Sequence, residues 1–188
     1  FSFSEKLISS LFHAVTPRTA GFNTLDLNSL TPASRMLTMI LMFIGAGSGS
    51  TAGGIKVTTF VVIILSVISY SKNYTDLEIY GRRLESSIIR RAFFIVSFYT
   101  MSIIFGAFLL LCLTPGLGFG KGMFEVVSAI GTVGLSTGIT PTLPAASKFV
   151  LIVLMYIGRV GSLTVAMAIA RKKIVPNIKF PVEKITIG

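Results

Sequence analysis

The chain has 188 residues, of which 52% are hydrophobic and 13% are charged, with a formal net charge of +10. Soluble domains carry about 25% charged residues, so this composition excludes an ordinary soluble protein and indicates a membrane protein. The basic residues cluster beside apolar runs, which argues against a nucleic-acid partner. One histidine and one cysteine provide no catalytic or metal-ligand set, so we do not expect an enzyme.

In chain order, the predicted elements form an all-α polytopic membrane protein built from two helix–pore loop–helix units. The first copy, residues 1–70, has a short helix at 5–15, a turn at 19–23 and a long helix at 33–70 that is broken by a loop at 45–54. A connecting segment at 71–91 leads to the second copy, residues 88–170. This copy has a spanning helix at 88–113, a short helix at 120–131, a turn at 132–136 and a long helix at 145–170, followed by a tail at 171–188.

One fixed spacing relates the two copies. The sequence TAGFN at 19–23 precedes TVGLS at 132–136 by 113 residues, and MFIG at 42–45 precedes MYIG at 155–158 by the same distance. Repeated matches at one spacing indicate an internal duplication. The helix that would correspond to 88–113 in the first copy falls before residue 1, so we expect the missing segment to lie upstream.

The distribution of basic residues predicts the orientation in the membrane. Five Lys or Arg residues lie between 72 and 91 and five more between 171 and 184, whereas 25–32 and 114–120 have none. Because cytoplasmic segments are enriched in Lys and Arg, we place 71–91 and 171–188 in the cytoplasm of a multi-pass cell-membrane protein that is surrounded by the lipid bilayer.

The two turns predict an ion filter. Backbone carbonyl oxygens can replace the hydration shell of a potassium ion, and glycine allows the backbone conformations that direct them inward. Each short helix ends just before its turn, so the negative end of its dipole points toward the ion. The alternative is a re-entrant loop without an ion. The predicted filter residues are Thr19, Ala20, Gly21, Phe22, Asn23, Thr132, Val133, Gly134, Leu135 and Ser136.

The glycine-rich loop at 45–54 predicts a gate. Five glycines in ten residues break the helix, and irregular backbone at membrane depth is tolerated only inside protein or beside a wet cavity. We expect this loop to move below the filter; the alternative is close helix packing through small residues. It is not a nucleotide-binding loop, because no Gly-Lys-Ser/Thr sequence follows. The predicted gate residues are Gly45, Gly47, Ser48, Gly49, Ser50, Thr51, Gly53, Gly54 and Arg159.

Arg159 is a charge in the middle of an apolar helix, which costs about 2.5–3.5 kcal/mol. The 113-residue spacing aligns it with Ala46, so we expect it to anchor the closed loop through freed carbonyls or the hydroxyls of Ser48, Ser50 and Thr51. The alternative is a structural arginine that is paired with a carboxylate. Glu125 is expected to be structural, either bracing a filter turn or pairing with a basic residue outside this chain.

Four sequences, TAGFN, TVGLS, MYIGRVGS and GAGSGSTAGG, resemble the Trk/Ktr/HKT superfamily, and in particular its KtrB-type potassium-translocating subunits. The resemblance covers essentially the whole chain as a C-terminal half, with most of a third repeat and all of a fourth. It implies a four-repeat, pseudo-tetrameric pore completed by the N-terminal half of the same pore. It also implies a homodimer and a cytoplasmic KtrA-type regulatory subunit with RCK domains, which alone binds nucleotide.

The resulting hypothesis is translocation of K+ across the cell membrane through the filter, gated by the loop and Arg159. Na+ stays open as an alternative ion, because the motifs do not fix the filter's dimensions or field strength. A non-conducting assembly subunit is the alternative from a different class, and the intact glycines of both turns argue against it.

Overall fold

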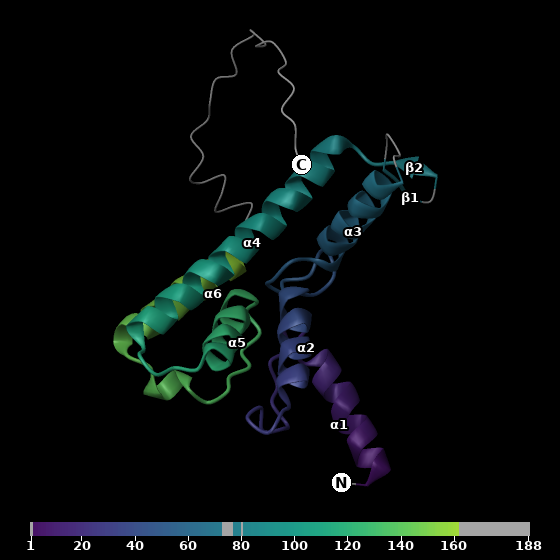
Figure 1. Cartoon of the computed structure of the whole chain (residues 1–188). Coiled ribbons are helices and arrows are strands. Elements are labelled where there is room, and N and C mark those ends of the chain that lie inside the picture. The colour runs from purple at the N-terminus through teal and green to yellow at the C-terminus, as the bar shows by residue number, and fades with distance from the viewer. Residues whose placement is uncertain (1, 73–76, 80, 162–188) are drawn as a thin grey trace.

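A computed structural model of the protein describes residues 2–72, 77–79 and 81–161. Figure 1 shows α4 and α6 side by side, with α5 in the angle between them and α2, while α1 extends from α2 toward the N-terminal end, where His13 bonds to Thr38 of α2 at 3.0 Å. In chain order the elements are α1 (Phe3–Val15), α2 (Pro32–Phe43), α3 (Val57–Ser71), β1 (Glu78–Ile79), β2 (Arg82–Arg83), α4 (Ser86–Leu113), α5 (Phe119–Ile130), a 3-10 turn η1 (Thr140–Thr142) and α6 (Ala145–Val160).

Local sequence signals explain where the helices begin. The Ser2 side chain accepts a hydrogen bond from the Glu5 amide while the Glu5 carboxylate accepts one from the Ser2 amide, which forms a capping box at the start of α1. The Thr31 side chain caps α2, and Pro32 occupies the first helical position, where its missing amide costs nothing.

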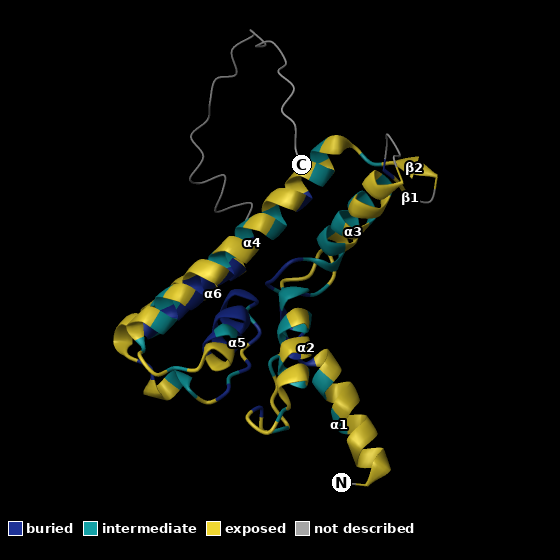
Figure 2. Cartoon of the chain, viewed as in Figure 1, coloured by how far each residue is buried: buried dark blue, intermediate teal, exposed yellow. Residues whose placement is uncertain are grey.

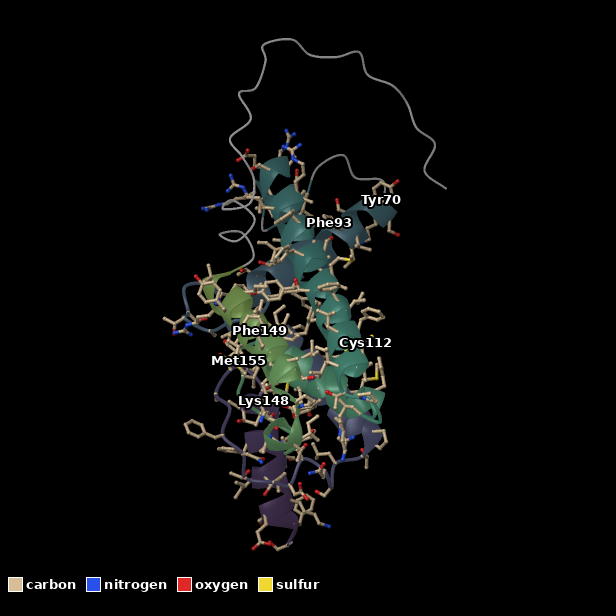
Figure 3. All side chains as sticks on the ribbon, turned by 90° about the vertical axis from the view of Figure 1, so that its left-hand side faces the viewer. Tyr70, Phe93, Cys112, Lys148, Phe149 and Met155 are labelled. Carbon is tan, nitrogen blue, oxygen red and sulfur yellow. The ribbon has the colours of Figure 1, made fainter. Side chains whose placement is uncertain are left out.

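Among the described residues, α4 is the one helix long and apolar enough to cross a membrane. Its most apolar 18 residues have a mean hydropathy of 2.2, yet only 28% of them are buried. The buried face includes Tyr99, Ile103 and Leu110. Figure 3 shows Phe93 and Cys112 along the same helix, and both are exposed. A helix with an exposed apolar surface of this extent is suited to contact with lipid.

The core is centred on α5, whose last two turns are buried almost completely (Figure 2). Phe124 and Val126 are fully buried, and α6 approaches the C-terminal end of α5 so closely that a Cβ atom on Gly158 would lie 1.9 Å from the Ile130 carbonyl oxygen. By contrast, α1 contains no buried residue. The short helix of the second copy is therefore enclosed by its neighbours, whereas that of the first copy is not.

The long helix predicted at 33–70 is divided into α2 and α3, and the segment between them contains the glycine-rich loop. The prediction of one continuous helix at 145–170 is wrong, because α6 ends at Val160. Gly161 has a φ of +88°, a left-handed conformation that ends the helix at the residue aligned with Ser48 of the loop. Residues 162–170 and the predicted tail at 171–188 lie outside the described residues.

The connecting segment predicted at 71–91 contains secondary structure. β1 and β2 form a two-stranded antiparallel hairpin in which Glu78 pairs with Arg83 and Ile79 with Arg82. Residues 86–91 already belong to α4. Both arginines of β2 are exposed, so this end of the molecule presents positive charge.

The contact between α6 and α5 generates a stability prediction. Replacing Gly158 with alanine forces a methyl group against the Ile130 carbonyl, which we expect to destabilise the full-length protein by about 1–3 kcal/mol. Thermal unfolding in detergent measures this effect. Gly120→Ala is the matched control, because Gly120 is also helical and a Cβ there meets no atom within 4 Å. Equal unfolding temperatures for the two variants would contradict the packing described.

Candidate functional site

The two filter turns share an unusual backbone conformation. Thr19 and Thr132 have φ values of +67° and +51°, and Gly21 and Gly134 have values of +74° and +91°. A left-handed conformation costs an L-residue roughly 1–2 kcal/mol and is rarest for β-branched side chains. The same strain at two positions 113 residues apart points to a functional backbone, because such strain persists only where the surroundings enforce it.

The amide groups of both turns are bonded to the ends of the short helices. The Gly21 amide donates to the Thr16 carbonyl at 3.1 Å, and the Val133 amide donates to the Ser128 carbonyl at 3.0 Å. Within the described part of the chain, no hydrogen bond reaches the carbonyl oxygens of residues 19–21 or 132–134. Positive φ values on both sides of Ala20 and of Val133 reorient the peptide groups of each turn, and carbonyl oxygens without a hydrogen bond can serve as ligands of a cation.

One carbonyl in each turn accepts a hydrogen bond from a hydroxyl at the end of its short helix. The hydroxyl of Thr16 donates to the Phe22 carbonyl oxygen at 2.6 Å, and the hydroxyl of Ser128 donates to the Leu135 carbonyl oxygen at 2.6 Å. A carbonyl oxygen has two lone pairs, so Phe22 and Leu135, like Asn23 and Ser136, stay predicted ion ligands. The first candidates are the three residues of each Thr-x-Gly sequence, whose carbonyls accept no hydrogen bond among the described residues.

The filter turns of the two copies meet. A Cβ atom on Gly21 would lie 2.0 Å from the Val133 carbonyl oxygen, so only glycine allows this approach. A cavity of about 740 Å³ borders the second turn and extends along α6 past Met155 to Arg159. The two turns and this cavity therefore form one continuous site.

The glycine-rich loop has a buried base and an exposed tip. At the base, the Gly45 amide donates to the Ile55 carbonyl at 2.8 Å and the Ile55 amide donates to the Phe43 carbonyl at 3.1 Å. A Cβ atom on Gly45 would lie 2.3 Å from the Gly53 carbonyl oxygen, so the two crossing segments require glycine. Residues 47–51 are exposed, and the loop is therefore fixed at its ends and open in its middle.

Two hydrogen bonds connect this loop to the rest of the site. The Gly53 amide donates to the Thr132 hydroxyl at 3.1 Å, which ties the loop to the first residue of the second filter turn. Arg159 donates from Nη1 to the Thr51 carbonyl oxygen at 2.6 Å. Of the groups predicted to solvate Arg159, a freed carbonyl is used, and none of the hydroxyls of Ser48, Ser50 and Thr51 bonds to it. The loop thus bridges the filter and α6.

Sequence reasoning missed two further basic residues of the site. Arg18 donates from Nη1 to the Ile44 carbonyl at 3.2 Å, so it links the first filter turn to the end of α2. Lys56 donates to the carbonyl oxygens of Ser50 at 3.0 Å and Ala52 at 2.5 Å. Each is a basic residue directly beside a predicted motif, and that position is the signal that could have identified it.

The chain is similar to cation transporters over nearly its whole length. The family described as "TrkH: Cation transport protein" matches residues 2–180. Potassium uptake protein B of the Ktr system of Bacillus subtilis (strain 168) is 45% identical over 98% of this chain and 41% of its own length. The potassium/sodium uptake protein NtpJ of Enterococcus hirae is 40% identical over 100% of this chain and 43% of its own length. The chain thus spans about two fifths of the curated relatives it matches.

A solved structure shares the fold. The potassium transporter TrkH from Vibrio parahaemolyticus superposes with a TM-score of 0.71 at 23% identity, covering 86% of this chain and 36% of that one. This likeness agrees with the all-α polytopic membrane fold predicted from the sequence, and confirms it.

The bond between the loop and the second filter turn is testable by hydrogen exchange. Thr132→Val keeps the β-branched shape but removes the acceptor for the Gly53 amide, so exchange in residues 45–56 is expected to accelerate about fivefold. Hydrogen–deuterium exchange mass spectrometry of the full-length protein measures this change. Thr132→Ser retains the hydroxyl and serves as the control. Exchange in the valine variant as slow as in the wild type would refute the contact.

Proposed function

Because the chain belongs to the TrkH family of cation transport proteins, we propose that it translocates potassium ions across the cell membrane through the two Thr-x-Gly turns. Membership of this family confirms the expectation of a transport protein rather than an enzyme. The observation that carries the proposal is the paired left-handed conformation of Thr19 and Thr132, whose carbonyls stay free while the amides around them are bonded.

The chemistry of the turns supports potassium as the cargo. Carbonyl oxygens at a fixed spacing can replace the water shed by a large monovalent cation. The first short helix points the negative end of its dipole at Thr19, and α5 does the same at Thr132. Relatives at 45% and 40% identity are named as potassium uptake proteins, which supports the same ion for this chain.

Sodium is the second candidate ion. The relative from Enterococcus hirae, at 40% identity, is named for both potassium and sodium. Selectivity between the two ions depends on the positions and field strength of the filter oxygens, which the Thr-x-Gly sequences leave open. Measuring uptake of both ions by one purified protein distinguishes the two candidates.

A filter variant tests the proposal. Gly134→Ser is expected to reduce the preference for K+ over Na+ about tenfold, because a non-glycine residue at this φ costs about 1–2 kcal/mol and shifts the neighbouring carbonyls. Uptake of both ions by the full-length protein in proteoliposomes gives the ratio. Gly116→Ser is the matched control, since Gly116 also has a positive φ and open surroundings but lies outside the turns. A wild-type ratio in Gly134→Ser would make the filter assignment wrong.

We infer that the glycine-rich loop and Arg159 form the gate. The loop lies against the first residue of the second filter turn, and its exposed tip at 47–51 is held by hydrogen bonds from Lys56 and Arg159. Arg159 holds Thr51 at this tip and places a positive charge beside the cavity below the filter. Both effects oppose cation passage, so release of the loop from Arg159 would open the path.

The gate is testable through transport rates. A hydrogen bond from a charged donor contributes about 1.5–3 kcal/mol, so Arg159→Gln is expected to raise maximal K+ uptake about tenfold. Deleting residues 47–51 should have the same effect. Lys148→Gln removes a positive charge from the same helix, at the position labelled in Figure 3, and should leave the rate unchanged. Unaltered or slower uptake by folded Arg159→Gln and deletion variants would count against the gate.

The assembly is also part of the proposal. We expect the N-terminal half of the same pore to cover α1, because its apolar residues Phe3, Leu7 and Leu11 are exposed and the chain spans 41% of its relative from Bacillus subtilis. That relative is named as part of a Ktr system, which supports a transporter of several components. We propose a homodimer and a cytoplasmic KtrA-type subunit whose RCK domains bind the nucleotide. The basic segments 71–91 and 171–188 would face that subunit.

A further inference from the structure

Glu125 is a buried carboxylate whose two oxygens accept hydrogen bonds from one short segment. The residue lies on α5 and is 5% exposed. Its Oε1 atom accepts from the Ser136 hydroxyl at 2.8 Å, the Thr137 amide at 2.8 Å and the Thr137 hydroxyl at 3.0 Å. Its Oε2 atom accepts from the Thr140 hydroxyl at 2.8 Å. A buried carboxylate is costly unless donors surround it, and here four do.

All four donors belong to the end of the second filter turn or to the residues just after it. Ser136 is the last residue of this turn, and its side chain is directed to the carboxylate rather than to an ion. The Ser136 hydroxyl in turn accepts from the Gly138 amide at 3.0 Å. The segment 136–140 is therefore wrapped around one side chain of α5, which fixes where the filter turn ends.

The first copy lacks this carboxylate. The residue 113 positions before Glu125 is Phe12, which is 40% exposed. Instead, the Asn28 side chain donates from Nδ2 to the Thr137 carbonyl oxygen at 3.0 Å. Thr137 thus bonds to Glu125 through its amide and hydroxyl and to the first copy through its carbonyl. One carboxylate therefore supports the end of the second filter turn and, through Thr137, is linked to the segment that follows the first turn.

We propose that Glu125 is a specificity-determining positioning residue that sets the K+ over Na+ preference by holding the outer end of the second filter turn and linking it to the segment after the first. The proposal rests on the proposed transport function. A filter discriminates between cations of different size only while its oxygens keep their positions, and rigid support from neighbouring groups keeps them there. Without the carboxylate, four donors lose their acceptor and segment 136–140 can relax around the smaller ion.

The role of Glu125 as an acceptor can be separated from that of its charge. Glutamine retains one oxygen for the three donors on Oε1, and its amide group can donate to the Thr140 hydroxyl, so Glu125→Gln preserves the support without the charge. Glu125→Ala removes both the hydrogen-bond acceptor and the charge. Glu85, an exposed carboxylate at the start of α4 that makes no side-chain capping bond, provides the matched controls Glu85→Gln and Glu85→Ala.

The experiment is K+ and Na+ uptake by the full-length protein in proteoliposomes, read as the ratio of the KM for Na+ to the KM for K+. Glu125→Ala is expected to lower this ratio about tenfold, whereas Glu125→Gln stays within about threefold of the wild type. Both Glu85 variants should match the wild type. A wild-type ratio in Glu125→Ala, or an equal loss in both Glu125 variants, would overturn the proposal. Failure of the wild type to transport K+ would instead refute the proposed function.

If Glu125→Ala does not fold, a second set of variants tests the proposed role of Glu125 in ion preference. The double variant Thr137→Val/Thr140→Val keeps the side-chain volumes and removes two of the four donors, so the ratio should fall about threefold. Asn28→Ala breaks the link to the first copy. This variant should also lower the KM ratio, but by less than the double variant. Wild-type ratios in both variants would overturn the proposal.

Discussion

Backbone that leaves a helix inside a bilayer needs a partner for each amide and carbonyl group, because hydrocarbon offers none. In the proposed pore, both filter turns and the glycine-rich loop are non-helical backbone of this kind. The ends of the short helices accept hydrogen bonds from the amides of Ala20, Gly21, Thr132 and Val133, and the hydroxyls of Thr16 and Ser128 donate to the carbonyls of Phe22 and Leu135. The carbonyls of the Thr-x-Gly residues accept no hydrogen bond among the described residues, and in the proposed function they bind the dehydrated cation.

The need for hydrogen-bond partners also explains three basic residues whose charges would otherwise be costly to place in a membrane. Arg18, Lys56 and Arg159 each donate to a carbonyl oxygen at or beside the glycine-rich loop. Because these donors are charged, they satisfy the loop and also place positive charge beside it. In the proposed gate, closure of the loop and repulsion of cations therefore have one structural origin. Release of the tip would remove the contact with Arg159 while the buried base keeps its backbone bonds.

Sequence patterns predicted the parts of this site that depend on spacing and composition. The 113-residue repeat identified two turns that share positive φ values at their Thr and Gly residues, and the density of glycine predicted the break between α2 and α3. The end of α6 at Val160 was not predicted, because the apolar run continues beyond it and one left-handed glycine ends the helix. The positions of Arg18 and Lys56 beside the predicted motifs could have indicated these residues, but their partners are backbone carbonyls, which any sequence provides, so no residue pattern could indicate the partners.

The central claim is that the free carbonyls of residues 19–21 and 132–134 bind the transported ion. Determining the structure of the full-length protein with Rb+ in place of K+, and locating the Rb+ by its anomalous scattering, tests this claim most directly. The account predicts an anomalous peak within coordination distance of these oxygens in both turns. A protein that transports Rb+ but shows its peaks only elsewhere, with none at the Thr-x-Gly carbonyls, would contradict it.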